Sequence, residues 1–190
     1  MSCPFLLLCK QRYGPSHPGA FTFVNEDTPT YDPKGNPRIE RLLNAEKAVT
    51  DNGGCCLRLA GLYNERRGAH NYWITSGKTT IDGSPKTFVN QLHYDDAASA
   101  CISTLQAGPD VTKSKIYLFS DGNPMTRIEI LESALENEHY KNYDKPEFEK
   151  GPNDEDGSAG HMYENSQTRD ELKWEPKYTW FGGVMSGVSK

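Results

Sequence analysis

Apolar residues in this chain gather in short continuous runs, and segments with helical periodicity lie between them. The run Phe5–Leu8 lies within the first twelve residues, and Cys55–Leu62 is almost wholly apolar. A third run fills most of Lys115–Ser120. Continuous apolar runs of this length are typical of strands in a sheet that is covered on both faces. The pattern predicts three buried strands, and it predicts a shorter strand over Phe88–Leu92.

The segments between these runs carry helix signals. Asn36-Pro37 opens a periodic segment that Asn52-Gly53-Gly54 ends, with a capping side chain at the start and glycine at the stop. Asp95-Asp96 precedes an alanine-rich helix, and acids stabilise the positive end of a helix. Thr126 and Glu129 have the spacing of a capping box, which predicts a third helix.

Loops and short elements complete the pattern. The proline-rich segment Tyr13–Pro37 is predicted to be mostly loop, and the acidic, glycine- and proline-rich segment Asn142–Gly160 is predicted to be a mobile loop. Arg66–Trp73 is interpreted as a polar, aromatic loop that follows a buried strand. A short helix is expected over Ser166–Leu172 and a last turn over Trp180–Met185. Because helices alternate with strands, the chain is assigned to the α/β class with parallel strand pairing.

Composition narrows the classes of function. A length of 190 residues suits one domain, or one domain and part of another. The 21 Lys and Arg residues against 26 Asp and Glu give a net charge of −5, which argues against a nucleic-acid partner and an anionic membrane surface. Hydrophobic residues make up 35% and mean hydropathy is −0.74, so the core is expected to be small. Ten Tyr, seven Phe and three Trp argue against disorder.

Cysteine usage and apolar run length bear on the compartment. The five cysteines include no Cys-x-x-Cys spacing, which argues against structural zinc and favours reduced thiols. No other metal site is predicted, since the acidic run Asp154–Gly157 lacks the spacing of a calcium loop. The run Phe5–Leu8 is too short for a signal segment or a membrane span. We expect an intracellular, soluble protein.

Phosphate-binding motifs are missing from the sequence. A dinucleotide fold requires Gly-x-Gly-x-x-Gly between its first strand and helix, so that backbone N–H groups can contact a pyrophosphate. No segment of the chain has this spacing, and the P-loop pattern is absent as well.

From Tyr13 to about Met185 the chain nevertheless resembles a known family. The similarity is to the distal part of extended or atypical short-chain dehydrogenase/reductases, the NAD-dependent epimerase/dehydratase superfamily, in a plant- or alga-type variant. It rests on eight motifs in order: Tyr13-Gly14, Val24–Pro29, Leu43–Glu46, Leu57–Tyr63, Arg67–Trp73, Leu92–Ala98, Ser120–Pro124 and Glu164–Tyr178.

The resemblance implies a partial Rossmann-like parallel sheet with a C-terminal substrate-binding region. On this interpretation residues 1–190 form a single partial domain, with 13–63 as the late Rossmann portion and 64–190 as the substrate-binding region with interleaved strands. The N-terminal βαβ half, which binds phosphate, is missing. The family implies NAD or NADP as cofactor and a small-molecule substrate, such as a nucleotide sugar or another polar metabolite. The resemblance is consistent with a location in either the cytoplasm or a plastid.

The chain departs from the family at its catalytic positions. The family's Ser or Thr falls where Cys9 and Lys10 stand, and its Tyr-x-x-x-Lys dyad falls at Arg38 and Leu42. The dyad works because a lysine lowers the tyrosine pKa, so that the phenol exchanges a proton at neutral pH. Arginine and leucine cannot do this, so no catalytic residue is assigned and the chain is expected to be inactive alone.

Seven residues are candidates for binding. The resemblance suggests Ala60 and Gly61 as cofactor-binding residues, and five side chains are candidates for substrate binding: Tyr13, Arg58, Arg67, His70 and His93. Structural alternatives stay open for each side chain. The ring of Tyr13 could equally pack against the domain. His93 could instead be a structural residue that joins a strand to the start of the next helix.

The two arginines and His70 have their own alternatives. Arg58 lies in an apolar strand, where a structural partner such as Asp95-Asp96 is favoured over a substrate anion. Arg67 and His70 suit a phosphate, carboxylate or sugar, or else a solvated loop.

Three hypotheses of function follow. The first is the C-terminal part of an NAD(P)-dependent epimerase/dehydratase-like oxidoreductase. The second is a non-catalytic pseudoenzyme or interaction fragment, prone to aggregate through open sheet edges. The third is a thiol hydrolase that uses Cys56, His93 and Asp95, although a cysteine in the middle of a strand is usually a small buried apolar residue.

Overall fold

The computed structural model describes residues 6–10, 22–30, 32, 36–150 and 159–188. Two features singled out in the sequence, Tyr13 and the acidic run Asp154–Gly157, lie outside the described residues.

A three-stranded parallel sheet forms the centre of the fold. Its strands are β1 (Leu6–Lys10), β3 (Cys55–Leu59) and β8 (Ile116–Phe119), in the order β1-β3-β8. β3 pairs on both sides, and all five of its residues are buried. The α/β class with parallel pairing, predicted from the apolar runs, is confirmed.

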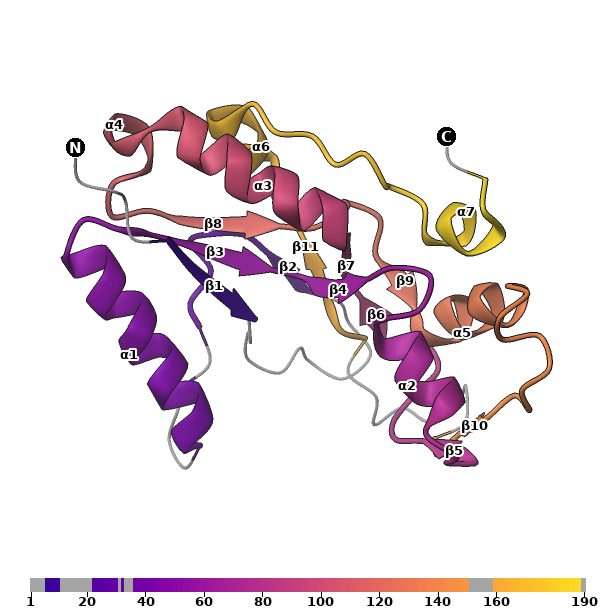
Figure 1. Cartoon of the computed structure of the whole chain (residues 1–190). Helices are drawn as coiled ribbons and strands as arrows, with labels where there is room; N and C mark the ends of the chain where they lie inside the picture. Colours follow the sequence, from indigo (N-terminus) through magenta and orange to yellow (C-terminus); the bar gives the residue numbers. More distant parts are fainter. Residues whose placement is uncertain (1–5, 11–21, 31, 33–35, 151–158, 189–190) are drawn as a thin grey trace.

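Two helices cover opposite faces of this sheet, as Figure 1 shows: α1 (Pro37–Asp51) and α3 (Tyr94–Ala107). Because strand side chains alternate, Cys56 and Arg58 point to α1 while Leu57 and its neighbours pack against α3. The crossovers β1-α1-β3 and β3-α3-β8 step in the same direction across the sheet. The second connection is not a simple βαβ unit, because residues 61–93 form further strands and a helix between β3 and α3.

The predicted strand Cys55–Leu62 is two strands, not one. β3 ends at Leu59, and β4 (Gly61–Tyr63) leaves the central sheet to pair in parallel with β7 (Gln91–His93). The change occurs at Ala60, whose N–H donates to the carbonyl of Phe119 at 2.9 Å while the next N–H donates to Asn90 at 3.0 Å. The N–H of Ala60 thus bonds to the central sheet, whereas the N–H of Gly61 bonds at the start of the β4–β7 pair.

The predicted strand Phe88–Leu92 also divides, into β6 (Phe88–Val89) and β7. β6 pairs antiparallel with β9 (Met125–Thr126). The loop expected over Arg66–Trp73 is a further correction, since its second half forms α2 (Ala69–Thr75).

The remaining elements surround this centre. The capping box predicted at Thr126 and Glu129 opens α5 (Arg127–Leu135) as expected, and α6 (Ser166–Leu172) has the predicted bounds. The other helices and strands are α4 (Pro109–Thr112), α7 (Phe181–Ser186), β2 (Thr22–Val24), β5 (Thr80–Ile81), β10 (Glu147–Phe148) and β11 (His161–Tyr163). β11 pairs with β2, and β10 with β5, both in parallel.

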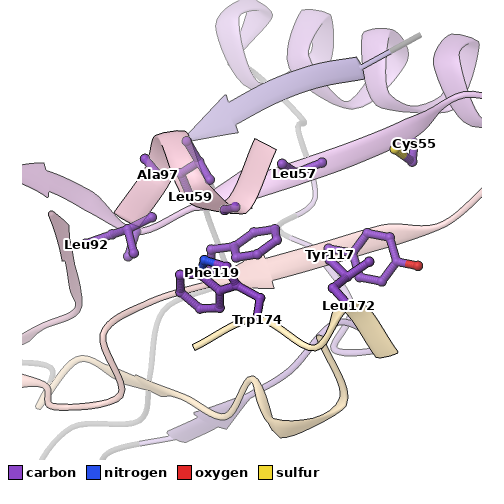
Figure 2. Close-up of a cluster of buried hydrophobic side chains, with 11 residues drawn as sticks. Cys55, Leu57, Leu59, Leu92, Ala97, Tyr117, Phe119, Leu172 and Trp174 are labelled. Atoms are coloured by element: carbon purple, nitrogen blue, oxygen red, sulfur yellow. The ribbon is translucent and has the colours of Figure 1, made fainter. Parts of the chain in front are cut away.

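Two apolar clusters form the core. The first, shown in Figure 2, joins β3 and β8 to α3, with Trp174 packed edge-to-face on Phe119 at 4.9 Å between ring centroids. The second joins Tyr63 to α5 and α7. In the described part of the chain, no helix combines the length and the apolar character that crossing a membrane requires.

Candidate functional site

A pocket of about 760 Å³ opens at the carboxyl end of β3. In open α/β folds ligands bind in the crevice outside the carboxyl ends of parallel strands, so this is the expected position of a site. Its described lining residues are Leu59, Ala60, Gly61, Leu62, Gly68, Ala69, Thr87, Phe88, Val89, Asn90, Tyr94, Gly160, His161 and Tyr163.

Asn90 holds the wall of this pocket in place. Its side-chain amide donates to the carbonyl of His161 at 2.7 Å, and its side-chain oxygen accepts from the N–H of Tyr163 at 2.9 Å. Both bonds are made to the main chain of β11, so one buried side chain fixes this strand beside β6. Sequence reasoning missed Asn90, although a lone amide at the break between two apolar pairs was an available signal.

Two glycines allow the backbone segments of the wall to approach each other. Gly160 has a φ of +86°, and a Cβ there would lie 2.6 Å from the carbonyl oxygen of Phe88. A Cβ at Gly61 would lie 3.1 Å from the carbonyl oxygen of Asn90. Any larger residue at Gly160 would force β6 and β11 apart.

Of the sequence candidates, Ala60 and Gly61 line this pocket. Arg58 does not, because it points into the opposite side of the sheet and makes two hydrogen bonds to Glu46, at 3.2 and 2.7 Å. Both side chains are buried. A structural partner for Arg58 was expected, but its identity is a correction: it is Glu46 on α1 and not the acidic start of α3.

Arg67 and His70 flank the pocket without lining it. Arg67 is exposed and forms a backbone bridge with Asn64. His70 is buried, with its ring edge-to-face against Tyr140 and Phe181. Burial lowers the pKa of His70 to about 4, against an opposing effect of the Glu65 carbonyl, so the imidazole is neutral at pH 7.

His93 ties β7 to α3. Its Nδ1 accepts a hydrogen bond from the N–H of Asp95 at 3.2 Å and so caps the helix. The ring lies edge-to-face on Tyr63 and packs on Tyr178 at 3.9 Å between centroids. Arg58, Arg67, His70 and His93 therefore do not converge on one point.

The thiol-hydrolase hypothesis is wrong. Cys56 faces α1, whereas His93 and Asp95 stand at the start of α3 on the other face of the sheet. Its thiol is fully buried, and burial together with the Glu46 carboxylate raises its pKa to about 11. Such a thiol does not form the thiolate that nucleophilic catalysis requires.

Two carboxyl groups, Asp96 and Asp121, are buried, and the burial of Asp121 was not anticipated from the sequence. Asp96 accepts hydrogen bonds from the N–H groups of Lys177 and Tyr178, at 2.8 and 2.9 Å. Burial, with the Asp96 charge adding to it, raises the pKa of Asp121 to about 8, so Asp121 is largely protonated at pH 7. These groups raise the pKa of buried Tyr63 as well, after the effect of burial itself.

The fold is shared with known enzymes, although neither a protein-family model nor a curated protein sequence matches the chain. dTDP-glucose 4,6-dehydratase from Bacillus anthracis, in complex with NAD, matches 97% of this chain with a TM-score of 0.71 at 18% identity. UDP-glucuronic acid 4-epimerase from Bacillus cereus, with UDP-glucuronic acid and NAD, matches 98% with a TM-score of 0.72 at 14% identity. UDP-glucose 4-epimerase from Thermotoga maritima, with UDP-glucose, matches 98% with a TM-score of 0.67 at 15% identity.

This chain covers only 60–62% of the length of these three proteins. The structural similarity therefore extends over almost all of this chain but over part of theirs. It establishes a Rossmann-type α/β fold of the kind found in NAD-dependent epimerases and dehydratases.

Proposed function

We propose that this chain is the substrate-binding part of an NAD(P)-dependent oxidoreductase of epimerase/dehydratase type, and that the dinucleotide-binding half of the fold lies outside these 190 residues. The observation that carries the proposal is the pocket of about 760 Å³ at the carboxyl end of β3, in a fold that matches an NAD-bound dehydratase over 97% of this chain. The substrate is a small polar molecule that enters this pocket.

The residues at hand do not fit the pyrophosphate of a dinucleotide. No Gly-x-Gly-x-x-Gly spacing occurs in the sequence. Of the two helices whose first residues border the pocket, α2 and α3, α3 carries Asp95 and Asp96 in its first turn, and these carboxylates repel an anion where a helix N-terminus would otherwise attract one.

The sheet edge is consistent with a second half of the fold. β1 pairs with β3 alone among the described strands, so its other edge is open to a further parallel strand. A βαβ unit added there would extend the sheet and place a helix N-terminus near the carboxyl ends of the strands. Ala60 and Gly61, which line the pocket, would then face the bound cofactor.

A non-catalytic role for the chain by itself is the second candidate. The family's acid/base dyad falls at Arg38 and Leu42 of α1, and neither side chain can act as a phenol–ammonium pair. On this view the pocket binds a ligand without transforming it.

Cofactor binding tests the proposal. We expect no binding of NADH or NADPH by the purified chain in a fluorescence titration or calorimetry. We also expect an in-frame Gly-x-x-Gly-x-x-Gly segment upstream of the Met1 codon, and binding of NAD(P)H by the longer product. Micromolar NAD(P)H affinity of the chain itself contradicts the proposal, and an upstream sequence without the glycine-rich segment favours the non-catalytic role.

A further inference from the structure

Two buried polar atoms in the interior have no hydrogen-bond partner among the described residues: the hydroxyl oxygen of Tyr63 and the Nε2 of His93. The two side chains come from paired positions of β4 and β7, and their rings lie edge-to-face with 5.4 Å between centroids. Tyr63 is 0% exposed and His93 is 5% exposed, so bulk solvent does not satisfy either group. Because a buried polar group without a partner costs free energy, both atoms require a partner that these residues do not supply.

The hydrogen bond at the other ring nitrogen of His93 determines where the imidazole carries its proton. Nδ1 accepts from the backbone N–H of Asp95 at 3.2 Å. A backbone N–H can only donate, so Nδ1 carries no proton and Nε2 carries it. Nε2 is therefore a donor, whereas the Tyr63 hydroxyl can both donate and accept.

Hydrogen-bond acceptors lie beside these two atoms. Asp96 accepts from the backbone N–H of Tyr178 at 2.9 Å, and the ring of Tyr178 packs on His93. Asp121 donates its backbone N–H to a carbonyl of β7 at 2.8 Å, so it flanks the strand that carries His93. The charges of both carboxyl groups act on the phenol of Tyr63. Each carboxyl oxygen can accept more than one hydrogen bond, so acceptors are available here.

The mixture of donors and acceptors determines what this place can hold. A cation would face the Nε2–H of His93, and the described residues include no group of three metal-ligating side chains. An anion would face the buried carboxyl group of Asp96. A neutral molecule that both donates and accepts suits both kinds of partner, and a buried water typically makes about three hydrogen bonds of this type.

We propose that one buried water molecule joins the Tyr63 hydroxyl and the Nε2–H of His93 to the carboxyl group of Asp121. Asp121 is largely protonated at pH 7, and in either protonation state it keeps an oxygen that accepts. The water holds the end of β4 in place, and Gly61 and Leu62 of this strand line the pocket at the end of β3. The inference does not depend on the proposed function.

A high-resolution crystal structure of the chain tests the site directly. We expect a water oxygen within hydrogen-bond distance of the Tyr63 hydroxyl and of a carboxyl oxygen of Asp121. Long-range ¹H–¹⁵N NMR spectra should show the proton of His93 on Nε2. A direct hydrogen bond from the Tyr63 hydroxyl to a protein group, an ordered interior without this water, or a His93 ring with its proton on Nδ1 overturns the inference.

A matched pair of variants tests the same water in solution. ¹⁷O magnetic relaxation dispersion detects water molecules that leave a protein slowly. We expect Tyr63→Phe, which loses one hydrogen bond to the water, to shorten the residence time of one such molecule by about fivefold. The control Tyr140→Phe also removes the hydroxyl of a buried tyrosine, but this hydroxyl bonds directly to Asn71 at 2.9 Å, so the water should be unaffected.

Both variants keep the aromatic ring that packs in the second apolar cluster, so both are expected to fold. Equal effects of the two variants on the slow water, or no effect of Tyr63→Phe, contradict the proposal. Binding of NAD(P)H plays no part in these measurements, so their failure leaves the proposed function standing.

Discussion

The Arg58–Glu46 pair shows how a charge is accommodated in an apolar strand. Arg58 is 4% exposed and Glu46 is 5% exposed, and their two hydrogen bonds join the centre of β3 to α1. Each charge has lost its hydration on burial, and only the other charge of the pair offsets that loss. The pair therefore serves mainly to fix how α1 lies on the sheet.

Replacing one partner should be much worse than replacing both. We expect Arg58→Met to lower the free energy of unfolding by about 3–5 kcal/mol, because Glu46 is left buried without a partner. The double variant Arg58→Met/Glu46→Leu should recover most of this loss. Urea denaturation of the two single variants and the double variant measures it. Additive losses would contradict a coupled pair.

Asp121 should give the protein an unusual pH dependence. Its pKa is about 8 in the folded chain, above its ordinary value of 3.8, so over this range the folded state holds a proton that the unfolded state has released. The free energy of unfolding should therefore fall as pH rises toward 8. His70, whose pKa is lowered from 6.5 to about 4, makes the free energy of unfolding rise with pH over that range. The effect of Asp121 is therefore clearest above pH 6.5.

The variant Asp121→Asn isolates this effect. An asparagine can still accept the hydrogen bond from the N–H of Asn123, which the carboxyl oxygen accepts at 2.9 Å, but it cannot ionise. We expect it to be more stable than wild type at pH 8, on the order of 1–3 kcal/mol, and to equal it more nearly at pH 5. Urea denaturation of both proteins at several pH values gives the difference. A difference independent of pH would show that Asp121 is ionised throughout.

The role of a residue could be predicted where it depends only on its neighbours in the sequence. The caps at Asn36 and Thr126 follow from spacing alone, and both form as expected. The partner of Arg58 could not be predicted from the sequence. Glu46 lies twelve residues away on a helix, and the orientation of that helix on the sheet cannot be read from local spacing. The elevated pKa of Asp121 depends on burial among distant elements and leaves no local signal.

At the scale of elements, a buried carboxylate and several ring contacts hold the segment that leads to α7. Asp96 binds the backbone of Lys177 and Tyr178, the ring of Tyr178 lies on His93, and Phe181 lies between Tyr63 and His70. A carboxylate on α3 thus fixes the chain that leads to α7.

Removal of this carboxylate should loosen the segment. We expect Asp96→Ala to speed amide hydrogen exchange first at Lys177 and Tyr178 and then across α7, while the β3 amides keep their protection. Asp95→Ala removes the neighbouring, exposed carboxylate, which only accepts a hydrogen bond from the Tyr178 hydroxyl at 3.4 Å, and should have the smaller effect. Equal exchange in wild type and Asp96→Ala would mean that the other contacts of the segment hold it without this carboxylate.

The sequence predicted whether a segment is a helix or a strand better than it predicted where each element begins and ends. The run Cys55–Leu62 looks like one strand because both parts are apolar, and the exchange of partners at Ala60 depends on where Phe119 and Asn90 lie. α2 was missed because its polar and aromatic residues show no clear helical period over seven residues. Ala60 and Gly61 could be placed at the pocket because the end of a parallel strand is a general position for ligands.

At the scale of the molecule, the edge strand determines behaviour in solution. β1 has a parallel partner on one side only among the described strands, and an open strand edge offers backbone donors and acceptors to other chains. The proposed second half of the fold would cover this edge.

The isolated chain should therefore associate. We expect sedimentation velocity to show species larger than a monomer as the concentration rises from roughly micromolar toward millimolar, and a broad melt. Attachment of the proposed upstream segment should suppress both. A monodisperse monomer with a sharp, cooperative melt would show instead that these residues form a complete folding unit.

The position of the core residues along the chain has a consequence for synthesis. Leu172 and Trp174 belong to the cluster around β3 and β8, and Phe181, Val184 and Met185 belong to the second cluster. A ribosome delivers these residues after it has delivered β3 and β8, so neither cluster is complete until the chain has been synthesised past Leu172 and Met185. Until then the apolar faces of β3 and β8 lack these partners, and a product that stops before Leu172 would lack part of both clusters.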